Sequence, residues 1–321
     1  MEKSILIVTN KHAELASHII YILRFKFGEK KLIRLNSEED GGGLYLRFGG
    51  DKAILCFDQG EKSIVLQPTK ELEKMSFFYY QGSLPFPKHY NELEYFKSIN
   101  KTVDISLRKF ICKYSHRAII AFPESLNFKL SNLLLAQSLG LKIPETEVFN
   151  AYKVGGKKIS PVNKISKAIT NIYRVRTEEK LQEGPGTFRL KELPKRSQYF
   201  TPSLLQKEVI KDFEIRSVYL LGSFYSMAIF SQNDEQTKLD YRNYNRTKPN
   251  RNIPFSLPKS IESKLESIAQ ELGLKFCSFD LIRDKQGDYV FIEVNPEGQI
   301  GWVSRNCNYH IEFKIAEYLA S

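Results

Sequence analysis

Residues 276–299, which read FCSFDLIRDKQGDYVFIEVNPEGQ, constrain the fold of this chain more than any other stretch. Two apolar-rich runs flank Gln286-Gly287, and a glycine at the second central position is typical of a two-residue β-hairpin turn. A turn centred there places Asp280 directly opposite Glu293, with their Cβ atoms about 4.5–5.5 Å apart. Opposed like charges destabilise a sheet, so this register predicts a cation between the two carboxylates.

The alternation of side chains along the two strands predicts which residues share a face. One face holds Phe279, Leu281, Ile292 and Val294. The other face holds Asp280, Glu293 and Asn295, together with Ile282 and Phe291. Magnesium prefers oxygen ligands and is usually held by one or two carboxylates together with nucleotide phosphates. The polar face is therefore either a magnesium site or the ordinary solvated side of a half-buried sheet, and a three-residue loop would shift the register by one.

Composition is that of a soluble globular protein, since 42% of the 321 residues are hydrophobic and 26% are charged. Such a length allows two or three lobes, each with its own core. No segment approaches the roughly 18 apolar residues of a membrane span, and the N-terminus lacks the layout of a signal peptide, so we expect a cytoplasmic protein. The four cysteines show no CxxC pairing, so neither a zinc site nor a disulfide framework is predicted.

The net charge of +11 is concentrated in residues 151–212, which hold 14 Lys or Arg against 6 Asp or Glu. Such a patch suits nucleotide phosphates, an acidic polypeptide or a nucleic acid backbone. The sequence has no zinc-finger spacing, RNP-like aromatic strand or heptad-linked basic helix, so nucleic acid is disfavoured. Within the patch, Lys164 and Lys191 are expected on strands, either as point charges for phosphate or as solvated surface.

Strand, helix and strand patterns follow one another at residues 4–9, 14–27 and 32–36, and predict the start of a parallel α/β layer. A glycine run at residues 41–43 is followed by a strand pattern and not by a helix, so it predicts a turn and not a phosphate cradle. Two further amphipathic helices are predicted at residues 132–139 and 261–272.

Two pairs of charged residues in the second half of the chain are candidates for chemistry. Glu214 and Arg216 are two residues apart on a strand and share a face. They fit a ribose acceptor and a guanidinium that neutralises phosphoryl charge, or else a common ion pair on a sheet surface. Asp240 and Arg242 lie in the long polar stretch 232–258, and loops of that length are often functional.

Several of these stretches together resemble the C-terminal half of ATP-grasp ligases: QKEVIKDFEIR, the Asp-Tyr-Arg loop, the helix ending in LGL, and the hairpin that closes on EVNPEGQ. Within that superfamily the chain resembles graspetide synthetases, and most of all the branch of grasp-with-spasm peptide maturases. The stretch FYSMAIFSQNDEQTKLDYRNYN is the most branch-specific. The match is strong from about Gln206 onward and weaker before it. NKISKAI resembles the lysine-containing nucleotide strand of the family, without the usual proline after the lysine.

The resemblance implies an α/β (α+β) chain with an ATP-grasp fold. A Rossmann-like pre-ATP-grasp lobe would occupy residues 1–117, a small central lobe 118–205, and a C-terminal lobe that binds nucleotide and metal 206–321. Family members are commonly homodimers, and their basic central lobe recognises the leader part of a precursor peptide.

Residue roles follow from the same resemblance. Lys164, and Lys191 with it, would contact ATP phosphates, and the backbone of Gln206, Lys207, Glu208 and Val209 would meet adenine. Glu214 would meet ribose, Arg216 and Arg242 would neutralise the transferring phosphate, and Asp280, Glu293 and Asn295 would hold Mg²⁺. No general base stands out, and Asp240 is the candidate for that role.

The expected reaction is phosphoryl transfer from ATP to Asp or Glu side chains of a ribosomal precursor peptide, followed by attack of a Ser or Thr hydroxyl or a Lys amine. Two alternatives remain open. One is an ATP-grasp ligase that adds an amino acid to a protein or joins small molecules. The other is a basic binding module that has kept the shape of the fold without turnover.

Overall fold

The structure of the chain is a computed structural model. It describes residues 4–28, 32–38, 43–49, 52–59, 62–66, 74–84, 94–115, 117–121, 128–151, 153–154, 157–169, 174–176, 181–183, 187–189 and 199–321. The chain forms two compact units. The first comprises Met1–Phe122, Leu274–Phe276 and Pro296–Ser321, and the second comprises Pro123–Gly273 and Cys277–Asn295. The lobe boundaries predicted at residues 117 and 205 stay predictions.

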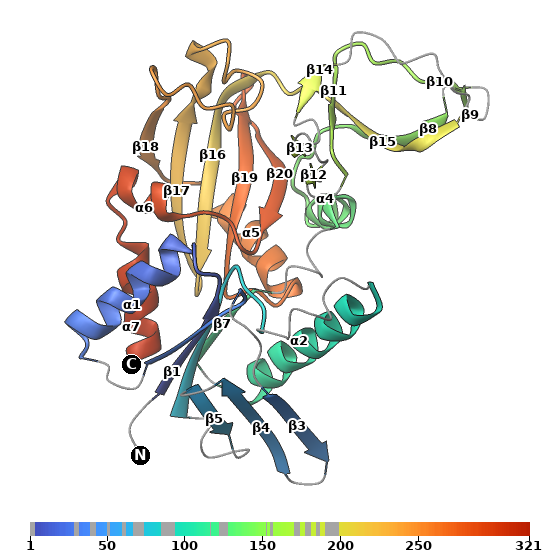
Figure 1. Cartoon of the computed structure of the whole chain (residues 1–321). Coiled ribbons are helices and arrows are strands. Elements are labelled where there is room, and N and C mark those ends of the chain that lie inside the picture. The colour runs from blue at the N-terminus through green and yellow to red at the C-terminus, as the bar shows by residue number, and fades with distance from the viewer. Residues whose placement is uncertain are drawn as a thin grey trace. The chain divides into compact units, whose positions relative to one another are not determined.

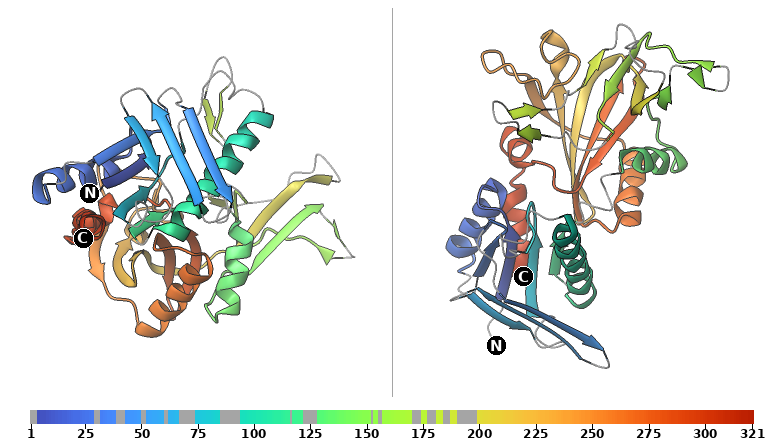
Figure 2. Two further views of the ribbon diagram at one scale, coloured as in Figure 1. Left: turned by 90° about the horizontal axis from the view of Figure 1, so that it is seen from below. Right: turned by 45° about the vertical axis from the view of Figure 1, so that its right-hand side comes forward.

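A parallel sheet with the strand order β2-β1-β6-β7 lies at the centre of the first unit (Figures 1 and 2). Its strands are β1 (Ser4–Thr9), β2 (Leu32–Asn36), β6 (Met75–Tyr79) and β7 (Arg117–Ile120). The helices described in this unit are α1 (Glu14–Lys26), α2 (Glu94–Tyr114), α6 (Gly301–Cys307) and α7 (Ile311–Ala320). The predicted strand, helix and strand at the N-terminus are confirmed.

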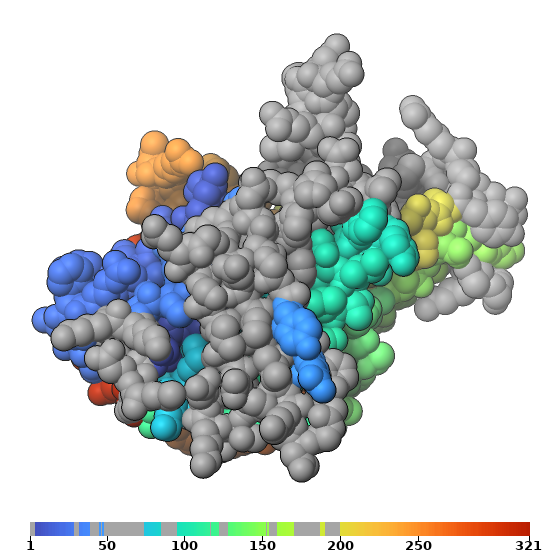
Figure 3. Space-filling model, turned by 60° about the horizontal axis from the view of Figure 1, so that its bottom comes forward, coloured from blue at the N-terminus to red at the C-terminus, as the bar shows by residue number. Residues whose placement is uncertain are grey.

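Both faces of this sheet are covered, and every residue of β1 is buried. Leu6 and Val8 of β1 pack with Leu107 and Ile111 of α2. On the other face α7 contacts β6, β7 and α1. Burial on both faces explains why β1 is a continuous apolar run rather than an alternating one. The outer surfaces of α1 (blue) and α2 (teal) are exposed in Figure 3.

A small antiparallel sheet with the order β3-β4-β5 completes the first unit. Its strands are β3 (Gly43–Gly49), β4 (Lys52–Gln59) and β5 (Lys62–Leu66). Gly43 begins a strand and not a helix, which agrees with the predicted turn, while residues 41 and 42 lie outside the described residues.

The second unit contains a five-stranded antiparallel sheet with the order β18-β17-β16-β19-β20. Its strands are β16 (Lys211–Leu220), β17 (Ser223–Phe230), β18 (Arg251–Phe255), β19 (Phe276–Asp284) and β20 (Tyr289–Asn295). Helix α4 (Lys129–Ser138) packs beside β20, and α5 (Lys259–Glu271) packs beside α4 (Figure 1). Both helices were predicted, although α4 begins three residues earlier than its apolar pattern indicated.

A four-stranded sheet with the order β14-β11-β15-β8 belongs to the same unit. Its strands are β8 (Thr146–Ala151), β11 (Lys164–Lys167), β14 (Phe188–Arg189) and β15 (Tyr199–Lys207). Two short ribbons pair β9 (Lys153–Val154) with β10 (Lys157–Lys158) and β12 (Arg174–Arg176) with β13 (Leu181–Glu183). Between β17 and β18, residues 231–250 form a loop that begins with the 3-10 turn η3 (Ser231–Asn233).

The turn of the β19–β20 hairpin differs from the prediction. Asp284 N–H donates to the Asp288 carbonyl at 2.9 Å, so the loop between them holds three residues and not two. Gly287 in this loop has φ +89°, a conformation that glycine adopts without the clash a Cβ would cause. The two-residue turn centred on Gln286-Gly287 is therefore wrong.

A β-bulge further along β20 restores the predicted pairing. Leu281 pairs with Phe291 and Asp280 pairs with Glu293, which leaves Ile292 as the extra residue. Because the three-residue loop shifts the register between the turn and the bulge, the predicted faces of Phe291 and Ile292 are wrong. Phe291 is fully buried, with its ring centroid 6.4 Å from that of Phe279, and Ile292 turns to the face of Asp280.

None of the described helices is long and apolar enough to cross a membrane.

Candidate functional site

A cleft within the second unit gathers most of the residues that the sequence singled out. Its apolar lining consists of Pro144, Ile165, Val209, Ile215, Leu239, Leu281, Ile282 and Ile292. Its polar lining consists of Lys167, Thr187, Gln206, Lys207, Glu208, Lys211, Glu214, Asp240, Tyr241, Arg242, Asp280 and Glu293. An apolar pocket with charged groups converging at one end is the form of a small-molecule site.

At the charged end of the cleft, Asp280 is bound by Arg216 from the neighbouring strand β16. One guanidinium nitrogen, Nη1, lies 2.8 and 2.9 Å from the two carboxylate oxygens of Asp280. Burial raises the pKa of Asp280, and the facing Glu293 acts in the same direction against the opposing effect of Arg216. Arg216 does not line the cleft itself but lies directly behind Asp280.

Glu293 is surrounded by three cations. Lys129 Nζ of α4 lies 3.7 Å from Glu293 Oε2, and Arg242 Nη1 lies 3.8 Å from Oε1. Burial alone would raise the pKa of Glu293, but Lys129, Arg242 and Lys167 hold it below its usual range. Lys129 also donates to the Ala168 carbonyl at 3.2 Å, so it joins α4 to the end of β11.

The lysine of β11 that faces the cleft is Lys167, which the sequence did not single out. Lys164 and Lys167 are three residues apart on a strand, so they point to opposite faces. Lys164 Nζ lies 2.5 Å from Glu147 Oε2 and does not line the cleft. Burial lowers the pKa of Lys167 to about 8, against the attraction of Glu293. Lys191 lies outside the described residues.

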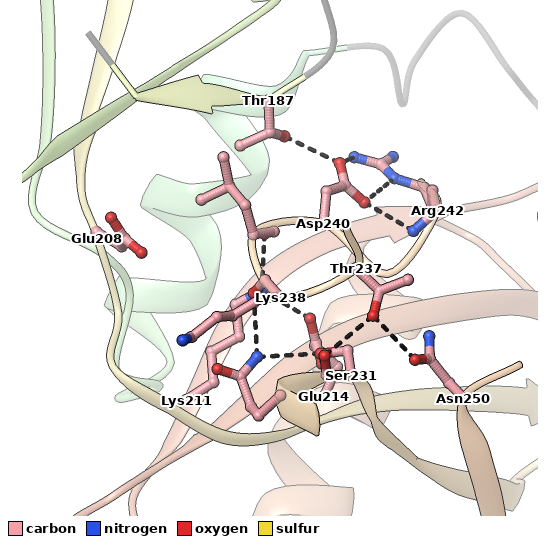
Figure 4. A network of polar contacts seen from close by, with 12 residues as sticks. Thr187, Glu208, Lys211, Glu214, Ser231, Thr237, Lys238, Asp240, Arg242 and Asn250 are labelled. Carbon is pink, nitrogen blue, oxygen red and sulfur yellow. Dashed lines mark hydrogen bonds and ion pairs between the residues drawn. The ribbon is translucent and has the colours of Figure 1, made fainter. Parts of the chain in front are cut away.

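Asp240 and Arg242 form a close pair in the loop between β17 and β18 (Figure 4). Arg242 Nε and Nη2 lie 2.8 and 2.7 Å from the two Asp240 oxygens, and Thr187 Oγ1 donates to Asp240 at 3.1 Å. Burial would raise the pKa of Asp240, but its bonds with Arg242 lower it to about 2. A carboxylate held in this way is a weak base, so the geometry favours Asp240 as an anchor for Arg242. Tyr241 between them also lines the cleft.

Glu214 belongs to a buried polar network in the same view (Figure 4). Lys211 Nζ donates to Glu214 Oε1 at 2.7 Å, and the Ser231 hydroxyl donates to Oε2. Glu214 and Lys211 are 4% and 9% exposed. The predicted reading of Glu214 and Arg216 as an ion pair with each other is not seen, because each is bonded to a different residue.

The residues Gln206–Val209 all line the cleft. The N–H groups of Lys207 and Glu208 are already bonded, to the carbonyls of Glu145 and Asn163 at 2.9 and 3.0 Å. The N–H of Val209 has no hydrogen-bond partner in the part of the chain that the structure describes. A free backbone donor beside apolar side chains suits the edge of a planar heterocycle.

The donor set of the charged end fits magnesium with a nucleotide. Asp280 and Glu293 are opposed carboxylates, and Asn295 lies two residues beyond Glu293 on the same strand face. No cluster of three or more His, Cys, Asp or Glu side chains arranged for a metal occurs among the described residues, and one or two carboxylates are the usual protein ligands of magnesium that is bound with phosphates. Arg216 Nε is buried and has no hydrogen-bond partner among the described residues.

Sequence reasoning missed Lys129, Lys167 and Lys211. Lys129 is the first residue of α4, where a cation opposes the helix dipole, and this unfavourable position was an available signal. Which face of β11 points into the cleft depends on how the strand packs in the unit. Lys211 pairs with Glu214 three residues further along β16, where simple alternation would place the two side chains on opposite faces.

Neither the models of known protein families nor the sequences of curated proteins match this chain. Solved structures do. A RiPP-associated ATP-grasp ligase from Chryseobacterium gregarium, in complex with ADP and a leader and core peptide, has 20% identity and a TM-score of 0.75, over 100% of this chain and 96% of that one. Macrocyclase MdnC of Microcystis aeruginosa MRC, bound with precursor peptide MdnA, has 22% identity and a TM-score of 0.71, over 98% of each chain.

The ATP-grasp ligase PsnB, complexed with a minimal precursor, Mg and ADP, has 14% identity and a TM-score of 0.65, over 99% of this chain and 98% of that one. At these identities the likeness establishes the fold. The chain therefore has an ATP-grasp fold, as predicted from its sequence.

Proposed function

We propose that the chain is an ATP-dependent peptide macrocyclase. One observation carries the proposal: the opposed carboxylates Asp280 and Glu293 meet a cluster of cations in a cleft that also has a large apolar lining. ATP has matching parts, an apolar heterocycle and a highly charged triphosphate. Similar structures were solved with ADP and with precursor peptides, which supports the same class of substrates here.

In the proposed complex, adenine lies against the apolar lining and accepts from the Val209 N–H. Glu214 accepts from ribose hydroxyls, since each of its oxygens keeps a lone pair beside its present bond. Lys129 and Lys167 bind the phosphates, and Asp280, Glu293 and Asn295 hold Mg²⁺. When bound, magnesium neutralises phosphate charge and orients the phosphates.

The proposed reaction has two steps. A side-chain carboxylate of the peptide attacks the γ-phosphorus of ATP, which forms an acyl phosphate and releases ADP. A Ser or Thr hydroxyl, or a Lys amine, then attacks the acyl carbon, loses its proton to solvent and displaces phosphate, so an ester or amide closes the ring. Arg216 and Arg242 stabilise the charge of the transferring phosphoryl group.

The first test is nucleotide binding, measured by titration calorimetry with ADP in the presence and absence of Mg²⁺. We expect Glu293→Gln to abolish the Mg²⁺-dependent part of the ADP affinity and to leave metal-free ADP binding intact. Unchanged Mg²⁺ dependence would refute the metal site and the enzyme assignment with it.

The second test is incubation with ATP, Mg²⁺ and the peptide of a neighbouring short reading frame with an end rich in Ser or Thr and Asp or Glu. Internal cross-linking removes one water per link in the mass spectrum, whereas ligation of an amino acid adds mass. Loss of water supports the macrocyclase. A gain of mass favours the alternative ligase, and no change together with tight peptide binding favours a binding module. A homodimer is part of the proposal, and light scattering after size-exclusion chromatography tests it.

A further inference from the structure

The loop 231–250, which carries Asp240 and Arg242, has little regular structure of its own. It joins β17 to β18 and contains one 3-10 turn and no strand. Its backbone bonds are local, such as Lys238 N–H to Asp234 and Asn243 N–H to Asp240, at 2.9 and 3.0 Å. Bonds within a loop do not fix its position, so the place of Arg242 depends on bonds to the rest of the unit.

Lys211 supplies such bonds from the first residue of β16 (Figure 4). Its ammonium lies 2.8 Å from the Leu239 carbonyl and 3.2 Å from the Lys238 carbonyl. These are the two residues directly before Asp240. With the bond to Glu214 Oε1 at 2.7 Å, all three ammonium protons have an acceptor.

Because all three N–H donors of the Lys211 ammonium are in use, Lys211 is better suited to holding the loop than to binding a nucleotide phosphate. A lysine that binds nucleotide phosphate needs a donor left for the ligand, and Lys211 has none without breaking a buried bond. Lys129 and Lys167 lie beside Glu293 at the charged end, whereas Lys211 lies beside Glu214. Its acceptors belong to the protein, and two of them belong to the loop.

We propose that Lys211 is a positioning residue that fastens the loop 231–250 to β16, and that it acts on Arg242 through Asp240. The chain of contacts runs from Lys211 to the carbonyls of Lys238 and Leu239, on to Asp240, and from Asp240 to Arg242. At the other end of this chain of contacts, Lys211 donates to Glu214, which also accepts from Ser231 of the loop and is the residue proposed to meet ribose. The effect on turnover rests on the proposed function, whereas the fastening of the loop does not.

Hydrogen exchange of the nucleotide-free protein tests the fastening, with the amides of Lys238, Arg242 and Asn243 as reporters. In Lys211→Met we expect their exchange to accelerate about ten- to a hundredfold, because charge-assisted bonds are lost, while exchange in β1 and β6 stays unchanged. Lys238→Ala is the matched control, since it removes a lysine side chain from the loop but keeps the carbonyl that Lys211 binds.

A double variant separates the fastening from simple charge balance. If Lys211 only neutralises Glu214, then Lys211→Met with Glu214→Gln restores slow exchange in the loop. Under our proposal the exchange stays fast, because the Leu239 carbonyl still lacks its donor and the Lys238 carbonyl keeps only its bond from Gln232 Nε2 at 3.0 Å. The double variant also removes the unpaired buried carboxylate, so it serves if the single variant does not fold. Slow exchange in either folded variant overturns the proposal.

The kinetic constants of turnover distinguish a positioning role of Lys211 from a purely structural one. With the peptide substrate and ATP, we expect Lys211→Met to lower kcat about tenfold or more, with a smaller change in the KM for ATP, because Arg242 acts on the transferring phosphate. Lys211→Arg, which keeps a buried donor, restores part of kcat. If the wild-type protein fails to bind ADP, the proposed function fails while the exchange result still decides the role of Lys211.

Discussion

Asp280 lies opposite Glu293 because a bulge at Ile292 compensates for the three-residue loop that closes the hairpin. Without the bulge, Ile292 would take the position directly opposite Asp280, and the Glu293 side chain would turn to the apolar face. The metal site proposed here thus depends on two backbone irregularities that offset each other. Bulges are common beside active sites for this reason, since they redirect a single side chain.

The loop of this hairpin gives a first prediction. Gly287→Ala should lower the free energy of unfolding by about 1 kcal/mol, because alanine is strained at a φ of +89°. Space is not the cause, since the added Cβ would have Arg283 Nη2 as its nearest neighbour, at 3.6 Å. Urea unfolding measures the change. Gly301→Ala is the control, where no positive φ applies and the nearest atom is 3.8 Å away. Equal costs at both positions would contradict the explanation.

The two lysines of β11 give a second prediction. Lys167→Met should weaken ADP binding roughly tenfold or more, because it removes a cation from the phosphate end of the cleft. Lys164→Met removes a cation three residues away that is paired with Glu147, and should change ADP affinity little. Titration calorimetry at one pH and salt concentration compares the two. A larger effect of Lys164→Met would restore the role that the sequence gave to Lys164.

The contact of Lys142 with Asp284 gives a prediction that depends on pH. Asp284 Oδ2 accepts from Lys142 at 2.8 Å, and Oδ1 accepts from the N–H groups of Gln286 and Asp288. Burial would raise the pKa of Asp284, but these bonds lower it. A depressed pKa means that the carboxylate stabilises the fold above its unfolded pKa of about 3.9, and that this contribution is lost as the pH falls through the lower folded value.

Asp284→Asn should therefore lower the free energy of unfolding by about 1–2 kcal/mol at pH 7, and by less at pH 3. Urea titrations at the two pH values measure the difference. Lys142→Met should reproduce part of the loss at pH 7, because it removes one of the donors. A penalty that grows toward acid would show that the sign is wrong.

A buried cluster in the first unit gives a fourth prediction. Arg108 Nε donates to Asp104 at 2.8 Å, Nη2 donates to the Gly82 carbonyl at 2.7 Å, and Nη1 donates to that of Ala121. Arg108→Met should cost about 3–5 kcal/mol, because it leaves Asp104 buried without its cation. Arg108→Met with Asp104→Asn should recover part of the loss. Thermal unfolding measures both, and a cost below that of Gly287→Ala would contradict this view of the cluster.

The sequence predicted those features that depend on local pattern. The parallel start of the first unit follows from an apolar run with no polar alternation, and α5 follows from its helical spacing. The opposition of Asp280 and Glu293 was predicted from an assumed two-residue turn, and the bulge made the same pair meet for a different reason. The faces of Phe291 and Ile292 were wrong because the alternation was counted from a turn that is one residue too short.

The remaining parts of the site depend on contacts between distant segments. Lys164 was chosen because NKISKAI resembles the nucleotide strand of the family, and only the structure shows that Lys167 is the lysine of β11 that faces the cleft. Lys129 contacts Glu293 across 164 positions of the chain, and no local pattern indicates that contact. The sequence made Asp240 a candidate base, whereas its bonds to Arg242 fit an anchor for that arginine.

The first unit takes its helices α6 and α7 from residues 296–321, so it is completed only after all of the second unit has been synthesised. Ile311, Ile315 and Leu319 of α7 are fully or almost fully buried. Until the ribosome has made them, the sheet that emerges first has an uncovered apolar face. A ribosome-stalled chain ending before residue 296 should therefore recruit chaperones to the exposed sheet of the first unit. All residues of the second unit, which is nearly contiguous in sequence, have been synthesised by that point.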